Sequence, residues 1–438
     1  MTRLIYTYYG DDFTGSTDVL EALAAAGVRS VLFVDVPSES QRRRFADCQA
    51  IGIAGESRSR TPEWMSKRLP GIFGHLAGLG ALILHYKTCS TFDSSAAIGS
   101  IGRALEIGRE AVPGPIIPIV VAAPHLGRFV AFGNLFAAAG DNVYRLDRHP
   151  TMRSHPVTPM HEADLRRHLA AQTALRIGAV ELPALALGTD SDVLGACIAS
   201  GDQAVLFDGV SKSDLARTGR LLWRQAQTQP LFCAGSSGLT YALLAAWRQA
   251  ALIPAESPVP PDIRPVDTLL VMSGSCSPVT ARQIQIALRE GYHGIAIDPT
   301  ILRADGDETR LTASVAREAV ESLSRGRSTV VYSALGRATV GTPLSGDRLG
   351  RWMGALLVRI LAVSPQNRRV LLAGGDTSSH AVAQLGISAL TWAGNLEPGA
   401  PLCQAHAENR PDLDGLELVL KGGQVGTDGF FERVRRGR

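Results

Sequence analysis

Short apolar runs rich in Val, Ile and Leu alternate along the chain with segments in which apolar residues recur at helical spacing. Runs of this composition are typical of strands that helices bury on both faces, as in parallel sheets. The predicted strands read LIYTYY, RSVLFVDV, AIGIAG, ALILHYK and IIPIVVAA and, later in the chain, QAVLFD, LFCAG, TLLVMSG, GIAID, STVVYSA, RVLLAGG and LELVLKGG. The pattern predicts an α/β protein with mainly parallel sheets flanked by helices.

A proline-rich stretch interrupts this alternation at residues 251–267, where five prolines fall within ALIPAESPVPPDIRPVD. Proline fixes its own φ and lacks an amide hydrogen, so such a stretch favours extended chain over helix or central strand. A chain of 438 residues is also longer than one hydrophobic core usually supports. We therefore predict two domains, residues 1–250 and 266–438, joined by a linker at residues 251–265.

Composition and charge argue against several classes of protein. A net charge of +3 is too small for the strongly basic face of a dedicated nucleic-acid binder. Six cysteines are scattered singly, without a C-x-x-C pair, as is typical of reduced thiols in the cytoplasm. Acidic residues follow the first strand before a signal peptide could form, and no apolar run approaches the length of a membrane span. We expect a cytoplasmic protein that acts on small soluble partners, with no nucleic acid and no membrane.

Three turns in the second half of the chain follow predicted strands and consist of glycine and small polar residues. Their candidate binding residues are Ser275 in SGSCSP, Gly374, Gly375, Asp376 and Thr377 in AGGDTSS, and Gly423 in KGGQVG. Glycine lets a ligand approach the backbone, and amides at a helix N-terminus attract anions. A phosphate group is therefore the ligand that these turns are best suited to bind. Asp376 could accept a hydrogen bond from a ribose hydroxyl or help to carry a magnesium ion.

Each of these turns alone is weak support for a binding site, because parallel α/β proteins also use such turns simply to connect elements. The chain contains neither a P-loop nor a G-x-G-x-x-G fingerprint after its first strand. A further turn, in LFCAGSSGLTY, has the same composition, and one interpretation of it is an ordinary connection between a strand and a helix. Taken together, the three turns support a binding site more strongly, because turns that follow parallel strands meet at the carboxyl edge of the sheet, where ligands bind.

Charged and hydroxyl residues follow three predicted strands in the first half of the chain. The candidates are Asp11 and Asp12 in YYGDDFTGSTD, Arg58 in GESRSR, and Lys87, Ser90, Thr91 and Asp93 in HYKTCSTFDSS. The two basic residues could bind a carboxylate, and Asp11 and Asp12 could accept hydrogen bonds from hydroxyls, which together suggest a pocket for a small hydroxy acid. The alternative for each is a helix cap or a surface ion pair, and either Thr14 or Ser16 is expected to cap the helix after the aspartates.

A polar segment punctuated by prolines, residues 145–160, precedes a helix that is predicted to begin near His161. Segments this long and this polar are rarely simple connectors. A lid, a subunit contact and a surface loop pinned by its prolines are all open interpretations.

Five motifs of the chain, GDDFTGSTD, YKTCSTFDS, SGSCSPVTARQI, AGGDTSS and KGGQVG, occur in the order found in the four-carbon acid sugar kinase family. The resemblance extends from about Tyr8 to Gly426. It implies an enzyme that uses ATP to phosphorylate the terminal hydroxyl of a four-carbon or related sugar acid such as 3-oxo-tetronate, threonate or erythronate. It also implies a sugar-acid-binding N-terminal domain, a nucleotide-binding C-terminal domain and an active site in the cleft between them.

The same resemblance assigns roles to the candidate residues. The family's nucleotide contacts would fall on Ser275, residues 374–377 and Gly423. Its sugar-acid contacts would fall near Asp11 or Asp12, on Arg58 and on residues 87–91.

Of the two aspartates, Asp12, or else Asp11, would accept the proton of the attacking hydroxyl in such a kinase. ATP and Mg²⁺ are the implied cofactors, and the ligands of the metal are left unassigned. A homo-oligomer is compatible with the sequence.

The YKTCSTFDS motif departs from the pattern of family members that act on threonate, which tend to read K-x-D-S-T-x-R-G. Cys89 stands in place of that Asp, and Asp93 stands in place of that Arg. Members with C-S-T-F-D-S look more like the 3-oxo-acid kinases, although Ser100 stands where those members usually have Asn. The expected substrate is therefore a branched or oxidised sugar acid related to 3-oxo-tetronate.

Two rival interpretations assign the chain to other classes of protein. The first is a two-domain, nucleotide-dependent dehydrogenase of hydroxy acids, and the missing glycine fingerprint argues against it. The second is a non-catalytic sugar-acid sensor, and no helix-turn-helix or other output module is evident in the sequence.

Overall fold

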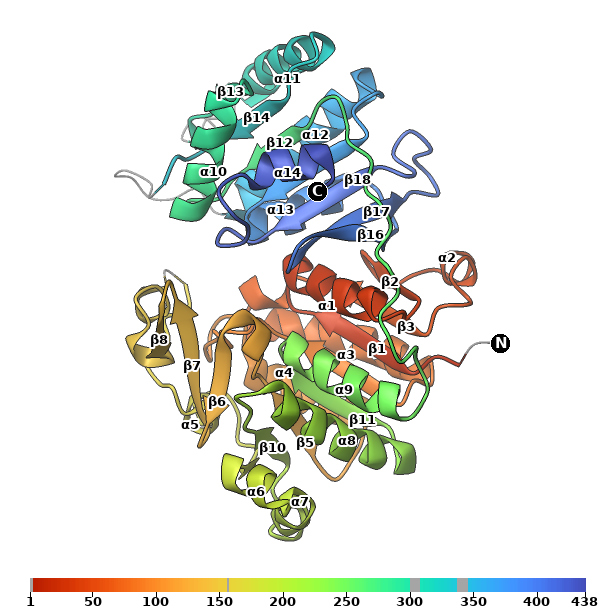
Figure 1. The fold of residues 1–438 in the computed structure, drawn as a ribbon, viewed down its shortest axis with the longest axis vertical. Helices are drawn as coiled ribbons and strands as arrows, with labels where there is room; N and C mark the ends of the chain where they lie inside the picture. Colours follow the sequence, from red (N-terminus) through yellow and green to blue (C-terminus); the bar gives the residue numbers. More distant parts are fainter. Residues whose placement is uncertain (1–2, 156, 300–307, 337–345) are drawn as a thin grey trace. The chain divides into compact units, whose positions relative to one another are not determined.

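The computed structural model describes residues 3–155, 157–299, 308–336 and 346–438 (Figure 1). Contacts divide the chain into two compact units. The first unit comprises Met1–Asp11, Ala22–Ser30 and Ala46–Pro258, and the second comprises Asp12–Glu21, Val31–Phe45 and Val259–Arg438. Helix α1 (Phe13–Ala25) and strand β2 (Ser30–Phe33) each span a boundary of this division, and helix α2 (Glu39–Arg43) lies in the second unit.

Parallel strands form the main sheet of the first unit, in the order β3, β1, β4, β11, β5, β10 and β9. Their bounds are β1 (Tyr6–Gly10), β3 (Ala50–Ala54), β4 (Ile83–Lys87), β5 (Ile117–Val120), β9 (Ile177–Val180), β10 (Ala204–Phe207) and β11 (Leu231–Gly235). Gly10 at the end of β1 lies opposite Ala54 of β3 and Lys87 of β4. Because the strands are parallel, the turns that follow them lie at one edge of the sheet.

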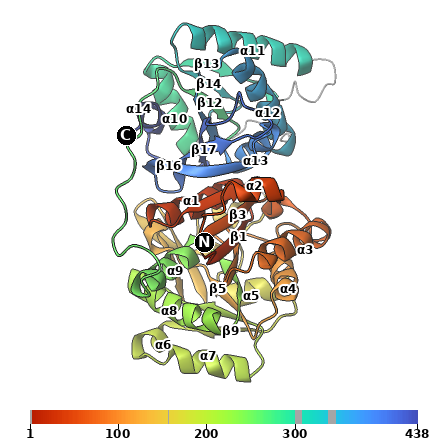
Figure 2. The same cartoon turned by 90° about the vertical axis from the view of Figure 1, so that its right-hand side faces the viewer.

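Helices cover both faces of this sheet, with α3 packed on α4 on one side and α8 packed on α9 on the other (Figure 2). The helices of this unit besides α1 are α3 (Pro62–Gly78), α4 (Ile101–Ala111), α5 (Leu165–Ala170), α6 (Leu182–Leu187), α7 (Asp190–Ala199), α8 (Lys212–Thr228) and α9 (Ser237–Gln249). Short 3₁₀ turns are η1 (Ser57–Ser59), η2 (Pro124–Leu126), η3 (Leu146–Arg148) and η4 (Met152–Ser154). Helix α8 begins where the sequence supplies a capping box, because Ser211 and Asp214 each accept a hydrogen bond from the other's backbone amide.

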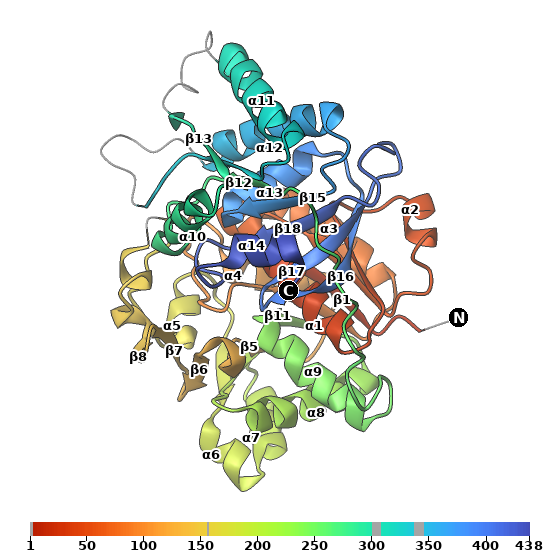
Figure 3. The same ribbon diagram turned by 45° about the horizontal axis from the view of Figure 1, so that its top comes forward.

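A small antiparallel sheet of β6 (Arg128–Ala131), β7 (Asn134–Ala139) and β8 (Asn142–Arg145) is inserted after β5. The amide of Leu135 donates to the carbonyl of Ala163 at 2.9 Å, so β7 lies beside the start of α5 (Figure 3). Residues 145–160 run between the end of β8 and that helix.

Parallel strands also form the larger part of the sheet of the second unit, in the order β13, β14, β12, β15 and β18. Two antiparallel strands, β17 and β16, continue it beyond β18. The bounds are β12 (Leu270–Ser273), β13 (His293–Ala296), β14 (Thr329–Tyr332), β15 (Arg369–Ala373), β16 (Ala389–Glu397), β17 (Ala400–His406) and β18 (Glu417–Lys421).

The helices of the second unit pack on both faces of its sheet. On one face, Val271, Leu371 and Val419 form a core with Ile284 of α10 (Pro278–Arg289) and Phe430 of α14 (Phe430–Arg436). The alternate residues of the strands point to the opposite face, where the helices are α11 (Glu308–Ser324), α12 (Gly346–Val363) and α13 (Gly375–Gln384). Helix α10 begins at the predicted Pro278, with Ser277 as its N-cap.

The predicted fold class is confirmed, since each domain has a mainly parallel sheet flanked by helices and every apolar run expected to be a strand contains one. The antiparallel strands were not predicted. In β6, β7 and β8 most residues are only half-buried or exposed, whereas the parallel strands β1, β3, β4 and β5 are fully buried.

Two helical glycines of the first unit differ in what surrounds them, and this difference predicts opposite effects of alanine. A Cβ at Gly219 in α8 would lie 1.8 Å from the carbonyl oxygen of Ala242 in α9, whereas a Cβ at Gly74 in α3 would meet nothing within 4 Å. We expect Gly219→Ala to destabilise the protein by about 3 kcal/mol through overpacking. Gly74→Ala should stabilise it by up to ~1 kcal/mol through helix propensity. Thermal unfolding of both variants measures this, and shifts of the same sign would contradict the close approach of α8 and α9.

Candidate functional site

The carboxyl edge of the main sheet in the first unit brings three predicted site residues together. The amide of Asp11 donates to the carbonyl of Lys87 at 2.9 Å, and the amide of Arg58 donates to the carbonyl of Asp11 at 3.1 Å. These bonds join the ends of β1 and β4 to the 3₁₀ turn after β3. The carboxyl group of Asp11 is itself buried.

Asp12 has a local structural role that the sequence analysis assigned to other residues. Its Oδ1 accepts a hydrogen bond from the amide of Gly15 at 2.6 Å, and its Oδ2 accepts one from the hydroxyl of Thr14 at 3.2 Å. Helix α1 begins at Phe13, so Asp12 occupies the N-cap position. The expectation that Thr14 or Ser16 caps this helix is therefore wrong.

The turn after β4 holds the other predicted residues of the first unit. Lys87 is buried, and its Nζ donates to the carbonyl of Thr88 at 3.0 Å. The amide of Thr88 donates to the carbonyl of Gly235 at 2.7 Å, which fixes the turn to the end of the neighbouring strand β11. Ser90 is half-buried in this turn, and Thr91 is buried.

Asp93, which the sequence places in the same candidate turn without a role of its own, is a buried carboxylate. Arg58 Nη2 donates to Asp93 Oδ2 at 2.8 Å, and the hydroxyls of Thr91 and Thr158 donate to the carboxylate at 2.5 and 3.1 Å. Burial alone would raise the pKa of Asp93, but the Arg58 guanidinium, the Thr91 hydroxyl and the nearby His155 together bring it to about 2. The signal in the sequence was the replacement of the family's Arg by Asp at this position, which allows the pair with Arg58.

His155 and Thr158 of the proline-punctuated segment therefore contribute to the surroundings of the candidate site. Thr158 contacts Asp93, and the amide and hydroxyl of Thr158 both lie 3.1 Å from His155 Nδ1. Helix α5 begins at Leu165, with Asp164 as its N-cap, so the helix predicted near His161 starts later. The lid, the subunit contact and the surface loop pinned by its prolines all stay interpretations of this segment.

Three predicted turns of the second unit meet at the carboxyl edge of its sheet. A Cβ at Gly374 would lie 3.2 Å from Thr377 Oγ1 and 3.4 Å from the amide nitrogen of Ser275. A Cβ at Gly423 would lie 2.7 Å from Ser275 Oγ and 3.0 Å from Ser277 Cβ, so a side chain there would have to displace these serines. Gly374 has φ of +116°, a conformation that L side chains rarely adopt. Gly375 starts α13, and Asp376 follows it there, but the side chain of Asp376 is outside the described part of the structure.

Helix α10 holds the glycine turn that follows β18. Lys421 Nζ donates to Thr280 Oγ1 at 2.8 Å, and the Thr280 hydroxyl donates to the carbonyl of Gly423 at 2.8 Å. One helical turn further on, Gln283 Nε2 donates to the carbonyls of Val425, Gly426 and Thr427 at 3.2, 3.0 and 2.9 Å. Burial lowers the pKa of Lys421 to about 7. Neither Lys421 nor Thr280 was among the predicted site residues.

The turn of LFCAGSSGLTY serves the packing of the first unit. A Cβ at Gly235 would lie 1.9 Å from the carbonyl oxygen of Val120, and one at Gly238 would lie 1.7 Å from that of Ala122. Backbone atoms fill the space that a ligand would need, so the interpretation as an ordinary connection is supported.

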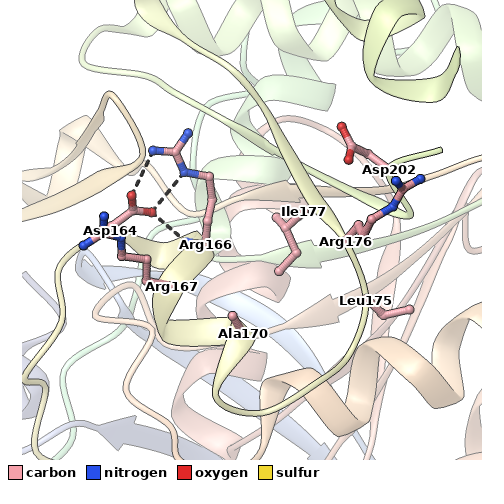
Figure 4. Close-up of a pocket in the computed structure, with 8 residues that line it drawn as sticks. All are labelled: Asp164, Arg166, Arg167, Ala170, Leu175, Arg176, Ile177 and Asp202. Carbon is pink, nitrogen blue, oxygen red and sulfur yellow. Dashed lines mark hydrogen bonds and ion pairs between the residues drawn. The ribbon is translucent and has the colours of Figure 1, made fainter. Parts of the chain in front are cut away.

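The first unit also has a surface pocket of about 500 Å³ (Figure 4). Asp164, Arg166, Arg167, Ala170, Leu175, Arg176, Ile177 and Asp202 line it. Leu175, Arg176 and Ile177 are at the amino end of β9, and Asp202 precedes β10. The pocket therefore opens at the amino edge of the sheet, opposite the edge where Asp11, Arg58 and Lys87 gather.

Among the described residues, no group of three or more His, Cys, Asp or Glu side chains is arranged to hold a metal ion. A Mg²⁺ ion that arrives with a nucleotide needs few protein ligands, because phosphate oxygens and waters supply most of its coordination. The chemistry of the turns in the second unit therefore fits a nucleotide that carries its own cation.

Comparison with known families matches both parts of the chain. A family model described as a sugar-binding N-terminal domain matches residues 6–243, and one described as a nucleotide-binding C-terminal domain matches residues 270–431. The chain belongs to the four-carbon acid sugar kinase family. The resemblance in its motifs is thus confirmed.

Relatives within this family cover almost the whole chain. A 3-oxo-isoapionate kinase of Paraburkholderia graminis is 45% identical and spans 99% of this chain and 95% of its own length. A 3-oxo-tetronate kinase of Burkholderia multivorans is 30% identical and spans 97% of this chain and 95% of its own length.

Solved structures share the fold of the four-carbon acid sugar kinase chain. A protein of Salmonella typhimurium LT2, described as a putative tRNA synthase, has a TM-score of 0.77 at 24% identity over 99% of both chains. A protein of Haemophilus influenzae has a TM-score of 0.70 at 24% identity over 98% of this chain and 99% of its own. These neighbours bear on the fold alone. In the part of the chain that the structure describes, no helix has the length and apolar character to cross a membrane.

The ion pair between the buried Asp93 and the half-buried Arg58 predicts a pH-dependent stability. The pKa of Asp93 is depressed to about 2, so its contribution is present above the unfolded-state pKa near 4 and is lost as the pH falls from about 4 toward 2. We expect Asp93→Asn to cost about 2 kcal/mol at pH 7 and progressively less below pH 4. Thermal unfolding of wild type and variant between pH 7 and pH 3 measures the difference.

Asp141→Asn, in the exposed turn between β7 and β8, is the matched control and should show no such pH-dependent difference. A gap between wild type and Asp93→Asn that stays constant down to pH 3 would contradict a carboxylate held ionised by Arg58.

Proposed function

We propose that this protein is a kinase that transfers the γ-phosphoryl group of ATP to the terminal hydroxyl of a branched or 3-oxo sugar acid. The observation that carries the proposal is the meeting of Ser275, Gly374, Thr377 and Gly423, which come from three separate strand ends of the second unit. Membership of a family whose curated relatives are named sugar-acid kinases supports the same reaction.

The first substrate to consider is 3-oxo-isoapionate. The relative that acts on it is 45% identical to this chain, against 30% for the 3-oxo-tetronate kinase of Burkholderia multivorans. The pairing of Asp93 with Arg58 supports a substrate other than threonate, because members that act on threonate tend to carry Arg at the position of Asp93. We assign Arg58, Lys87, Ser90 and Thr91 to the surroundings of this acid.

In the second unit, the turns at Ser275, residues 374–377 and Gly423 would bind the nucleotide. Glycine at these positions lets backbone amides approach the phosphates, and the N-terminus of α13 supplies a positive dipole. A Mg²⁺ ion bound with ATP would neutralise part of the negative charge of the phosphates. Lys421 would keep the third turn in place through Thr280.

Transfer forms a bond between the hydroxyl oxygen and the γ-phosphorus and breaks the bond to the bridging oxygen, which releases ADP. We assign the proton of the hydroxyl to Asp12, because its carboxylate is only partly buried whereas that of Asp11 is buried. The main contribution of the protein would be positioning and charge neutralisation.

The two rival functions have less support. A dehydrogenase would need a dinucleotide fingerprint that the sequence lacks, and no curated relative above is named as one. A coupled assay of ADP release on 3-oxo-isoapionate, 3-oxo-tetronate, threonate and erythronate tests the kinase directly. Turnover of at least one acid is expected; binding of the acids with no ADP release would favour the sensor, and acid-dependent nicotinamide reduction would favour the dehydrogenase.

Gly375 offers a test of the nucleotide site, because a side chain there has room in the protein itself. A Cβ at Gly375 would meet nothing closer than 3.9 Å, and one at Gly429, before α14, would meet nothing within 4 Å. We expect Gly375→Val to weaken ATP binding about tenfold or more, or ~1.4 kcal/mol, by filling the path of the phosphates. Gly429→Val is the control and should bind ATP normally. Calorimetry measures both, and equal affinities would count against a nucleotide at this turn.

Asp12 can be tested apart from its role as a helix cap, because asparagine also caps helices well. We expect Asp12→Asn to reduce kcat about 100-fold or more while the melting temperature and the ATP affinity stay close to wild type. Asp12→Ala should in addition lose ~1 kcal/mol of stability with the cap. Wild-type turnover by Asp12→Asn, or a larger loss in Asp11→Asn, would remove Asp12 from the proposed role.

A further inference from the structure

Arg128 lies at the carboxyl edge of the first unit's main sheet, although its sequence context gives no motif. The amide of Arg128 donates to the carbonyl of Ala123 at 3.1 Å, and the amide of Ala123 donates to the carbonyl of Arg128 at 3.0 Å. Ala123 follows β5 closely, and the amide of Ser236 donates to Val120 at the end of that strand at 3.0 Å. Because Gly235 also holds the turn after Lys87, Arg128 belongs to the edge that carries the predicted sugar-acid residues.

The guanidinium of Arg128 is held in place by carbonyl groups alone. Its Nη1 donates to the carbonyls of Leu126 at 2.9 Å, Gly127 at 3.3 Å and Ala138 at 3.4 Å. Its buried Nε has no hydrogen-bond partner in the described structure. No ion pair joins Arg128 to an Asp or Glu of the described residues, and burial lowers the pKa of its guanidinium. A cation in this setting lacks the counter-charge that buried charges normally have.

The neighbours of Arg128 connect it with the turn after β4 and with residues 145–160. The thiol of Cys89 is close enough to interact electrostatically with the guanidinium. His149 Nδ1 accepts from the amides of Thr151 and Met152, both at 3.2 Å, so its other ring nitrogen carries the proton and donates to Ala138. Burial lowers the pKa of His149, with Arg128 as a further cause, so this imidazole is neutral at pH 7 and supplies no counter-charge.

The contrast with Arg58 decides which guanidinium is available for a substrate. Arg58 already forms an ion pair with the buried Asp93 at 2.8 Å. We propose that Arg128 binds the carboxylate of the sugar acid, and that Arg58 is a positioning residue that orders the turn after β4 through Asp93. This inference rests on the proposed function. A substrate carboxylate would accept hydrogen bonds from the Arg128 guanidinium and provide its counter-charge.

The test measures binding separately from turnover. Isothermal calorimetry compares the affinities of wild type and Arg128→Met for a sugar acid and for the matched neutral primary amide of that acid, with ATP binding as a check of folding. We expect Arg128→Met to bind the acid about 100-fold more weakly, as truncation of a buried charge partner predicts, while its affinity for the amide stays within threefold. Arg128→Lys keeps the positive charge but not the planar guanidinium group. Its affinity for the acid should lie between those of wild type and Arg128→Met.

Arg145→Met is the matched control, because Arg145 is on β8 of the same small sheet and its guanidinium is paired with Asp147. It should bind the acid as wild type does. Acid affinity of Arg128→Met within threefold of wild type, equal losses for acid and amide, or a wild type that binds no acid would each overturn the inference. A wild type that binds the acid yet releases no ADP overturns the proposed kinase activity alone.

Discussion

Hydrogen bonds between the carboxyl ends of neighbouring parallel strands hold both groups of candidate residues. In the first unit, the amide of Asp11 donates to Lys87, and the amide of Thr88 donates to Gly235. In the second, the amide of Gly374 donates to the carbonyl of Lys421 at 2.9 Å. Parallel pairing brings turns that are far apart in the sequence to one edge, and these bonds fix the backbone just before each turn begins. The chemistry of each unit depends on that geometry.

The two units use this edge in different ways. In the second unit, glycines and small hydroxyl residues keep side chains away from the backbone, and Thr280 and Gln283 of α10 hold the last turn through its carbonyl groups. This suits a ligand that is bound by backbone amides, as phosphates often are. In the first unit, the edge carries buried charges, and the balance among Arg58, Asp93 and Arg128 determines where an anion can bind.

Much of the fold could be predicted from the sequence because parallel strands buried on both faces leave continuous apolar runs. The site could be predicted to the level of turns, since residues after such strands must meet at one edge. Side-chain pairing could not be predicted in the same way. Arg58 and Asp93 are 35 positions apart, and Thr158 lies 65 positions beyond Asp93, so only the folded chain shows that they form one group.

Local signals were also ambiguous where one residue serves two purposes. Asp12 stands in a family motif and also caps α1. The cap was expected at Thr14 or Ser16, two or four positions later, because the apolar pattern of the helix becomes clear only after these residues. Arg128 had no motif at all. Its importance appears only when its contacts are compared with those of Arg58.

The central claim is that a phosphoryl group passes from ATP to a primary hydroxyl of a sugar acid. Proton-coupled phosphorus NMR of the products made from ATP and 3-oxo-isoapionate or 3-oxo-tetronate tests it most directly. The account predicts a new phosphomonoester whose phosphorus is coupled to the two protons of a CH₂ group, formed in equal amount to ADP. Formation of ADP with inorganic phosphate as the only other phosphorus product would contradict it.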